Sequence, residues 1–258
     1  MSILLNTDEH GVATLTLNRP EKMNAFDREM IKSWENALLE CADDSKVRVI
    51  VLTGAGRAFC AGGDAADMKK RAADTALDRK DYLFRSVHRI ALTMERMDKP
   101  VIAAVNGAAR GAGMDLALMC DIRFAAASAT FAESYVGLGL TAGGGGAWYL
   151  PRLTGLDHAL EIIWTARSVG AEEALKLGLV TKVVPDEALA NETHALARRI
   201  AAQPEHAVRF SKRAVYQGLN MSLIAHLDMV SSHVAVLRDT DDYRNKVADL
   251  IARKTRTR

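Results

Sequence analysis

The feature that most constrains this fold is a short β-branched run that ends in a glycine-bearing loop and is followed by a helical stretch. Residues 47–52 (VRVIVL) and residues 101–105 (VIAAV) each end at such a loop, and further rounds begin at Ile122 and Val180. Runs of this length and composition are typical of buried strands. No fixed sequence period accompanies the recurrence, so it indicates repeated architecture within an α/β fold.

The remaining segments complete this outline. Residues 3–17 are expected to form a hairpin, and Asp27 is a plausible N-cap for a helix. The apolar positions of this helix recur at three and four: Met30, Ile31, Trp34, Leu38 and Cys41. A second helix is predicted over residues 78–97. We divide the chain into a core of residues 1–203 and a wholly helical region of residues 204–258, which we expect to pack on the core or on a neighbouring subunit.

Composition excludes several classes of protein. The chain has 34 Lys and Arg against 32 Asp and Glu, a net charge of +2, so no overall field favours nucleic acid or a membrane surface. Cys41, Cys60 and Cys120 are odd in number and widely spaced, which indicates neither a disulfide framework nor a zinc site. The N-terminus lacks a targeting pattern and no apolar run is long enough to span a bilayer, so we expect a cytoplasmic protein.

Two glycine-rich segments follow predicted strands and are the candidates for chemistry. Residues 58–64 (AFCAGGD) let a ligand approach the main chain, although a tight turn has the same composition. Residues 106–115 (NGAARGAGMD) open onto a helix, whose first amides are free to bind negative charge. A dinucleotide loop is excluded because the chain lacks the expected first βα unit near its N-terminus, and no phosphate-loop motif occurs.

Taken together, these segments resemble the crotonase (enoyl-CoA hydratase/isomerase) superfamily. The resemblance covers nearly the whole chain in the order of that family. Its motifs are LNRPEKMNAF (17–26), VRVIVLTGAGRAFCAGGD (47–64), KPVIAAVNGAARGAGMDLALMCD (99–121), GGGGAWYLPRLTG (143–155) and AEEALKLGLVTKVVP (171–185). It implies a crotonase-like spiral of ββα turns, a C-terminal helical trimerisation region and a homotrimer or homohexamer.

The resemblance also implies an acyl-CoA thioester as substrate, with coenzyme A as part of that substrate and no metal or other cofactor. An oxyanion hole is implied at the amides of Gly63 and Ala112, where the thioester oxygen gains charge as an enolate forms. Each such donor is typically worth about 3–4 kcal/mol of the barrier. Residues that the family places along the CoA are Ala25, Ala61, Asp64, Ala65 and Gly111, with Arg253 reaching the CoA phosphates of a neighbouring subunit; a solvated tail is the alternative for Arg253.

The acid and base positions depart from the family pattern. Hydratases of the family use two glutamates, and the first position is Asp115 here, while the second falls on Tyr135. Glu133 lies two residues earlier and would share a face with Tyr135 in an extended strand, so it is a substitute acid or else a surface or interface carboxylate. A third acidic position of some relatives falls on Gly143. Asp115, Glu133 and Tyr135 are therefore the candidate proton-moving groups.

Two further residues have competing explanations. His88 lies near a catalytic histidine of dehalogenase-like relatives, although a structural role is the alternative. Arg110 replaces a small or aliphatic residue of relatives, and we expect it in a surface ion pair, with Asp64, Asp67 or a substrate carboxylate as the alternative partners. Hydration or double-bond isomerisation of an enoyl-CoA is the leading function. The alternatives are thioester or carbon–carbon bond hydrolysis on an acyl-CoA, and a silent acyl-CoA-binding protein.

Overall fold

The structure is a computed structural model that describes the backbone of residues 1–256 and the side chains of residues 1–252. The side chain of Arg253, the expected phosphate ligand, lies outside the described residues. The helices and strands follow one another as β1 (Ile3–Thr7), β2 (Val12–Leu17), η1 (Pro20–Lys22), α1 (Arg28–Asp43), β3 (Val49–Gly54), β4 (Ala58–Cys60), α2 (Ala65–Lys70), α3 (Ala76–Tyr82), η2 (Leu83–Val87), α4 (His88–Arg96), β5 (Val101–Val105), β6 (Ala108–Arg110), α5 (Ala112–Leu118), β7 (Ile122–Ala126), β8 (Thr130–Ala132), η3 (Val136–Leu138), α6 (Gly146–Thr154), α7 (Leu156–Thr165), β9 (Val169–Gly170), α8 (Ala171–Lys176), β10 (Lys182–Val184), η4 (Asp186–Ala188), α9 (Leu189–Ala201), α10 (Glu205–Gly218), α11 (Leu223–Arg238) and α12 (Asp241–Arg256).

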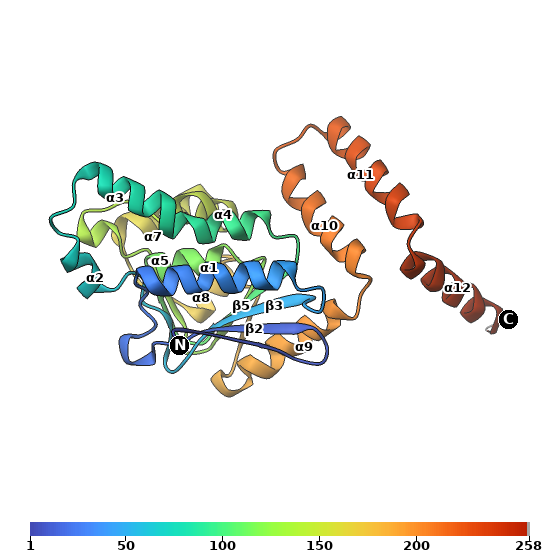
Figure 1. Ribbon diagram of the computed structural model, residues 1–258, viewed down its shortest axis with the longest axis horizontal. Coiled ribbons are helices and arrows are strands. Elements are labelled where there is room, and N and C mark those ends of the chain that lie inside the picture. Colours follow the sequence, from blue (N-terminus) through green and yellow to red (C-terminus); the bar gives the residue numbers. More distant parts are fainter. Residues whose placement is uncertain (257–258) are drawn as a thin grey trace.

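The strands form two separate sheets. The larger sheet has the order β1-β2-β3-β5-β7-β10 and the smaller has the order β4-β6-β8-β9. Three successive rounds, which begin at β3, β5 and β7, thus place one strand in the large sheet, the next in the small sheet, and then a helical segment. This confirms the predicted α/β spiral of ββα turns, and Figure 1 shows α1, α3 and α4 lying along the same side of the body.

The core lies around the large sheet because its central strands are buried on both faces. All five residues of β5 are buried, and β3 pairs in parallel with both β2 and β5. The predicted hairpin is present as antiparallel β1 and β2. Helix α1 begins after Asp27, whose side chain accepts a hydrogen bond from the amide of Met30 at 2.9 Å, and its apolar stripe is buried as the spacing predicts.

Three details differ from the sequence-based expectations. The short strands β4 and β6 lie inside segments that we assigned to loops, since three residues are too few for an alternation pattern to show. The helix expected over residues 78–97 is broken by a π-helical turn, Leu83–Val87. Strand β3 runs two residues further along the chain than its apolar run, because Thr53 and Gly54 continue the pairing with β2.

The last three helices extend away from the body (Figure 1). Neither α10 nor α11 contains a buried residue. Helix α10 is tied to the body through Asp121, which accepts hydrogen bonds from Lys212 at 2.8 Å and from Tyr216 at 2.8 Å. Large apolar side chains such as Ile224, 83% exposed, therefore remain uncovered in a single chain.

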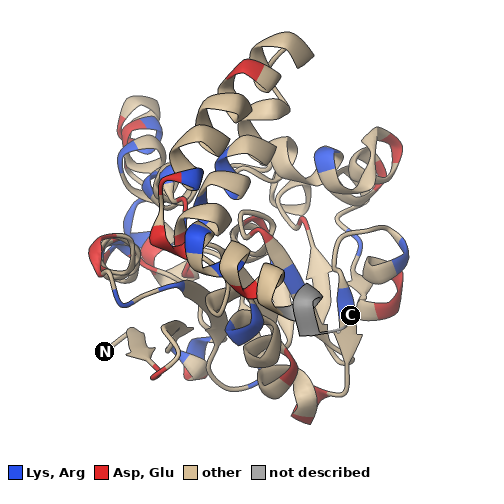
Figure 2. Ribbon diagram, turned by 90° about the vertical axis from the view of Figure 1, so that its right-hand side faces the viewer, with Lys and Arg blue, Asp and Glu red and all other residues tan. Residues whose placement is uncertain are grey.

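Charge is mixed over the surface. Figure 2 shows Lys and Arg interspersed with Asp and Glu on the face seen from the side of the C-terminal helices. In the described part of the chain, no helix is both long and apolar enough to cross a membrane. Across the same residues, no group of three or more His, Cys, Asp or Glu side chains is arranged to hold a metal ion.

Candidate active site

The small sheet brings the candidate residues to one edge. Strands β4, β6 and β8 are parallel, so their carboxyl ends lie at the same edge of the sheet. Gly63 follows β4, Ala112 follows β6, and both Glu133 and Tyr135 follow β8. Residues up to 72 positions apart in the sequence, Gly63 and Tyr135, thus meet because three short strands share one direction.

The two expected oxyanion donors lie where the first two of these loops touch. A Cβ added to Gly62 would lie 2.9 Å from the carbonyl oxygen of Arg110 and 3.5 Å from the amide nitrogen of Ala112. Gly62 also has a φ of +89°, which favours glycine. A Cβ on Gly113 would lie 2.0 Å from the Cys60 carbonyl oxygen. The glycines are required because the two backbones approach this closely.

Both donors are available to a ligand. The backbone groups on either side of Gly63 already form hydrogen bonds. The Phe26 amide donates to the Gly62 carbonyl at 2.8 Å, and the Asp64 amide donates to the Phe26 carbonyl at 2.9 Å. Within the described residues, neither the Gly63 amide nor the Ala112 amide donates a hydrogen bond to another protein group. Two fixed, free N–H groups at one edge can stabilise an oxygen that gains negative charge.

A pocket of about 770 Å³ opens at these amides. Its wall combines the glycine loops with apolar side chains and a few charged groups. The residues that border it are Phe26, Ala61–Ala65, Asp67, Met68, Arg71, Ala72, Arg79, Tyr82, Leu83, Val87, Arg110–Ala112, Ser134, Tyr135, Leu138, Leu140, Gly143 and Gly144. A pocket of this size is suited to a small organic group held mainly by apolar contacts.

Tyr135 and Asp115 form a hydrogen-bonded pair at this wall. The Tyr135 hydroxyl donates to Asp115 Oδ2 at 2.5 Å, and the Gly144 amide donates to the same oxygen at 2.9 Å. The Tyr135 ring lies beside Gly111, where an added Cβ would be 3.7 Å from the ring. Asp115 is fully buried and does not border the pocket, whereas Tyr135 does. The phenol is thus the group that a ligand meets.

Glu133 lies behind Asp115 and is also fully buried. Strand β8 ends at Ala132, so the extended geometry that would have placed Glu133 and Tyr135 on one face is absent, yet both side chains reach Asp115. Burial raises the pKa of Glu133 to about 10, with a further contribution from the Asp115 charge. Glu133 is therefore protonated at neutral pH and is a buried carboxyl group, not a surface one.

Asp115 and Glu133 are neighbouring buried carboxyl groups, and the pKa of each is raised. Burial raises the pKa of Asp115, while hydrogen bonds from Tyr135, Glu133 and Gly144 partly offset this. Asp115 Oδ1 and both Glu133 oxygens face no N–H or other O–H donor among the described side chains and backbone. Of the two carboxyl groups, Asp115 is the one that accepts hydrogen bonds, from the Tyr135 hydroxyl and the Gly144 amide, so ionisation is favoured at Asp115 over Glu133.

The four-glycine run is pressed against these carboxyl groups. A Cβ on Gly144 would lie 2.3 Å from Asp115 Oδ2, and a Cβ on Gly146 would lie 2.2 Å from Asp115 Oδ1 and 2.3 Å from Glu133 Oε1. The run of glycines therefore reflects close approach of the backbone to these two carboxyl groups.

This site and fold identify the chain's family. The enoyl-CoA hydratase/isomerase family model matches residues 7–252. The chain belongs to the enoyl-CoA hydratase/isomerase family. The predicted membership of the crotonase superfamily is confirmed.

Individual relatives agree with the family model. The 1,2-epoxyphenylacetyl-CoA isomerase of Escherichia coli K12 is 37% identical over 255 residues, which cover 99% of this chain and 97% of that protein. The short-chain-enoyl-CoA hydratase of Clostridium acetobutylicum is 36% identical, covering 95% of this chain and 93% of its own. The crystal structure of an enoyl-CoA hydratase from Mycobacterium smegmatis has a TM-score of 0.91 at 33% identity, covering 98% of this chain and 97% of that one. The chain is accordingly an enzyme of the hydratase or isomerase type.

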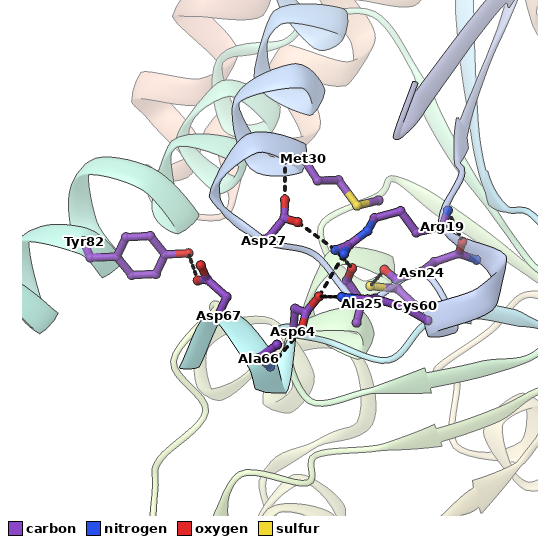
Figure 3. Close-up of polar contacts among 11 residues, drawn as sticks. Arg19, Asn24, Ala25, Asp27, Met30, Cys60, Asp64, Ala66, Asp67 and Tyr82 are labelled. Atoms are coloured by element: carbon purple, nitrogen blue, oxygen red, sulfur yellow. Dashed lines mark hydrogen bonds and ion pairs between the residues drawn. The ribbon is translucent and has the colours of Figure 1, made fainter. Parts of the chain in front are cut away.

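Asp64, which the family places along the CoA, is held by the protein itself. Its Oδ2 accepts from Arg19 at 2.8 Å, and its Oδ1 caps α2 through the Ala66 amide at 2.8 Å (Figure 3). The same Oδ2 accepts from Lys22 at 2.7 Å. The hydrogen bond from Lys22 is the largest of the effects that hold the pKa of Asp64 well below its usual range. Asp64 borders the pocket as a fixed carboxylate that does not exchange protons near neutral pH.

The other described residues that the family places along the CoA fall into two groups, those that border the pocket and one that does not. Ala61, Ala65 and Gly111 border the pocket. Ala25 is buried and is not among the residues of the pocket wall, and its carbonyl oxygen accepts a hydrogen bond from Arg19 at 2.6 Å. The next residue, Phe26, borders the pocket in its place.

Arg110 does not form the ion pair that we expected. Its guanidinium donates to the Thr130 hydroxyl at 3.4 Å, and no carboxylate of the described residues lies within ion-pair distance of it. The reason is that Arg19 and Lys22 already occupy Asp64. Arg110 borders the pocket, and none of the described carboxylates neutralises its charge.

Sequence reasoning also missed part of the pocket wall. Leu83 and Val87 of the π-helical turn border the pocket, and Tyr82 lies under the guanidinium of Arg71, 3.1 Å from the ring centroid. Their helical spacing indicated only an apolar face, which has the same pattern whether it packs on a core or lines a cavity. His88 does not border the pocket; its Nε2 lies 2.7 Å from the Gly143 carbonyl oxygen.

Proposed function

We propose that this enzyme isomerises the double bond of an enoyl-CoA thioester by moving a proton between two carbons through Tyr135 and Asp115. The observation that carries the proposal is Tyr135, which borders the pocket with its ring beside Gly111 and whose hydroxyl donates to the buried Asp115. It is a proton-moving group placed next to the free amides of Gly63 and Ala112.

The proposed first half of the reaction forms a dienolate. The thioester oxygen accepts hydrogen bonds from Gly63 and Ala112, which lowers the barrier as that oxygen gains charge. The Tyr135 oxygen takes the proton from the α-carbon while the Tyr135 hydroxyl proton passes to Asp115 Oδ2. Burial and the Asp115 charge raise the pKa of Tyr135, so a free tyrosinate is disfavoured and the two transfers are coupled.

The second half reverses the relay at another carbon. Tyr135 gives its proton to the γ-carbon and recovers a proton from Asp115, while the electrons of the dienolate return to the thioester carbonyl. The double bond has then moved by one position. Proton count and charge of the enzyme are unchanged, so no water or cofactor is consumed.

Hydration is less well supported by this geometry. Stereospecific addition of water requires one group to activate the water and another to protonate the α-carbon. The second carboxyl group, Glu133, is protonated, fully buried and separated from the pocket by Asp115 and Tyr135. It is not placed to activate a water molecule in the pocket.

The proposed substrate is a CoA thioester because the hydratase and isomerase relatives carry acyl-CoA names. We propose that Ala61, Asp64, Ala65 and Gly111 lie along the CoA, with Ala25 behind them. Arg253 is proposed to reach the CoA phosphates of a neighbouring subunit. Coenzyme A is part of the substrate, and the proposal includes no metal or separate cofactor.

A cyclic acyl group is the second candidate. The Escherichia coli relative that is 37% identical over 99% of this chain is a 1,2-epoxyphenylacetyl-CoA isomerase. A phenol held by a carboxylate can donate a proton to an epoxide oxygen in the same way that it donates one to carbon. The apolar pocket beside Tyr135 would accept a ring as well as a chain.

We also propose that the protein is a cytoplasmic homotrimer or homohexamer. Its support is the uncovered apolar surface of α10–α12, which includes Leu223 at 71% and Ile224 at 83% exposure. Light scattering after size-exclusion chromatography would distinguish three or six copies of the 28.0 kDa chain from one.

The assay compares three substrates with the purified enzyme. We expect turnover of a 3-enoyl-CoA to the 2-enoyl isomer to exceed hydration of crotonyl-CoA. Preferential turnover of 1,2-epoxyphenylacetyl-CoA would favour the cyclic candidate. Release of free CoA would favour a hydrolase, and tight acyl-CoA binding without turnover of any of these would favour a binding protein; either result would overturn the proposal.

A further inference from the structure

We infer that His88 is a positioning residue, which holds the Gly143–Gly144 peptide against Asp115 and thereby orients the base of the reaction. This inference rests on the proposed function. It concerns a residue that neither borders the pocket nor contacts Asp115 itself.

The geometry is a chain of hydrogen bonds through one peptide group. His88 Nε2 lies 2.7 Å from the Gly143 carbonyl oxygen, and the Gly144 amide donates to Asp115 Oδ2 at 2.9 Å. The Gly143 carbonyl and the Gly144 amide belong to the same planar unit. Because a carbonyl oxygen only accepts, His88 must carry its proton on Nε2. Any rotation of this peptide would break both bonds together.

The segment needs such an anchor because it is built of glycine. Residues 143–146 are all glycine, and Gly145 has a φ of +120°. Glycine is the most flexible residue, and the close packing on Asp115 and Glu133 forbids side chains at Gly144 and Gly146. The required close approach therefore removes the side chains that would fix the backbone, and His88 supplies a bond from outside the segment.

The position of His88 follows from the π-helical turn. Helix α4 begins at His88 directly after the π-helical residues Leu83–Val87. Leu83 and Val87 border the pocket, while His88 reaches past it to the glycine segment. The Phe84 ring packs edge-on against the imidazole, with the centroids 6.0 Å apart. Such turns are frequent at functional sites, and here one places apolar pocket residues and the anchor side by side.

Donation to the carbonyl also affects the Asp115 charge. A hydrogen bond accepted by a peptide oxygen polarises the unit and strengthens its N–H as a donor. The Gly144 amide is one of the groups that favour the charged form of Asp115. His88 thus supports the ionised state of Asp115 that accepts the proton from Tyr135.

The first experiment observes the Gly143–Gly144 peptide group directly by NMR spectroscopy, so it does not require enzymatic turnover. Glycine labelled with ¹³C at the carbonyl and ¹⁵N at the amide gives correlations only for Gly–Gly peptide bonds. These bonds are 62–63, 143–144, 144–145 and 145–146. Gly143→Ala identifies the 143–144 signal, because an added Cβ there meets only ordinary contacts of 3.6 Å or more.

We expect His88→Leu to shift the 143–144 carbonyl and amide resonances upfield together, and His88→Gln, which keeps a donor, to restore them. His158→Leu, an exposed histidine on α7, is the matched control and should leave them in place. An unchanged 143–144 signal in His88→Leu would overturn the inference, whether or not the wild type turns over an enoyl-CoA.

The second experiment measures the consequence for catalysis. In His88→Leu we expect kcat for the isomerisation to fall about 10-fold with KM changed less than about twofold, which corresponds to loss of one hydrogen bond. His88→Gln should recover most of kcat. Equal loss in both variants, or none in either, would show that His88 does not position Asp115. A wild type that does not isomerise any enoyl-CoA would instead defeat the proposed function, while the resonance shifts would still decide the role of His88.

Discussion

The Tyr135 hydroxyl lies 2.5 Å from Oδ2 of the fully buried Asp115, and the phenol alone of these two groups borders the pocket. Tyr135 thereby connects a buried carboxyl group to the pocket wall. If the proposed relay operates, tyrosine can occupy the position of the second family glutamate while a proton-moving group is retained.

Tyr135→Phe tests the relay. We expect kcat for isomerisation to fall about 100-fold or more, because the only bridge between Asp115 and the substrate is lost, while KM changes little. Tyr149→Phe, on the neighbouring helix α6, is the control. Near-normal kcat in Tyr135→Phe would mean that Asp115 acts on the substrate without the phenol.

Glu133→Gln tests the protonation state behind Asp115. The pKa of Glu133 is raised from 4.5 to about 10 in the folded protein, so the folded state binds more protons than the unfolded state between these values. Its contribution to stability is fully present below about pH 4.5 and is lost as the pH rises toward 10.

We therefore expect the free energy of unfolding of the wild type to fall more steeply from pH 6 to pH 9 than that of Glu133→Gln, which has no proton to lose. Urea unfolding at several pH values measures this difference. Parallel curves for the two proteins would show that Glu133 is ionised in the folded state.

Gly144→Ala tests the close approach of the glycine run. The new Cβ would lie 2.3 Å from Asp115 Oδ2, so the segment must move and the amide bond to Asp115 is lost. We expect a loss of stability of about 1–3 kcal/mol and a large loss of kcat. Gly137→Ala is the matched control, because no atom lies within 4 Å of its Cβ position. Similar behaviour of the two variants would argue against the tight packing.

Asp64→Asn tests whether this family position has a structural role. Asn keeps the shape but loses the charge that Arg19 and Lys22 bind, so we expect unfolding at pH 7 to become easier by about 1–2 kcal/mol. Because the folded pKa of Asp64 is lowered, this difference is present above its unfolded pKa of 3.8 and is lost as the pH falls below it. Asp43→Asn, an exposed site at the end of α1, is the control. Equal stability of Asp64→Asn and wild type at pH 7 would contradict the assignment.

Much of the architecture is determined by local sequence. The β-branched runs of β3 and β5 are buried strands because nothing polar interrupts them, and α1 follows its cap and its apolar spacing. The close contact between the loops at Gly63 and Ala112 can likewise be predicted from their glycines, because close backbone approach excludes a Cβ. Family membership and the location of the two amide donors depend on these local requirements alone.

The arrangement of the candidate acid and base groups was decided by tertiary structure. Asp115 and Tyr135 meet because β6 and β8 pair in parallel, and His88 meets Gly143 across 55 positions of sequence. Arg110 was wrongly expected in an ion pair because its competitors for Asp64 come from the distant residues Arg19 and Lys22. Whether a carboxyl group is charged depends on how much of the whole fold buries it, which no local pattern records. The sequence by itself therefore determined the two glycine loops and their free amides, and only the folded chain decided which side chains lie beside them.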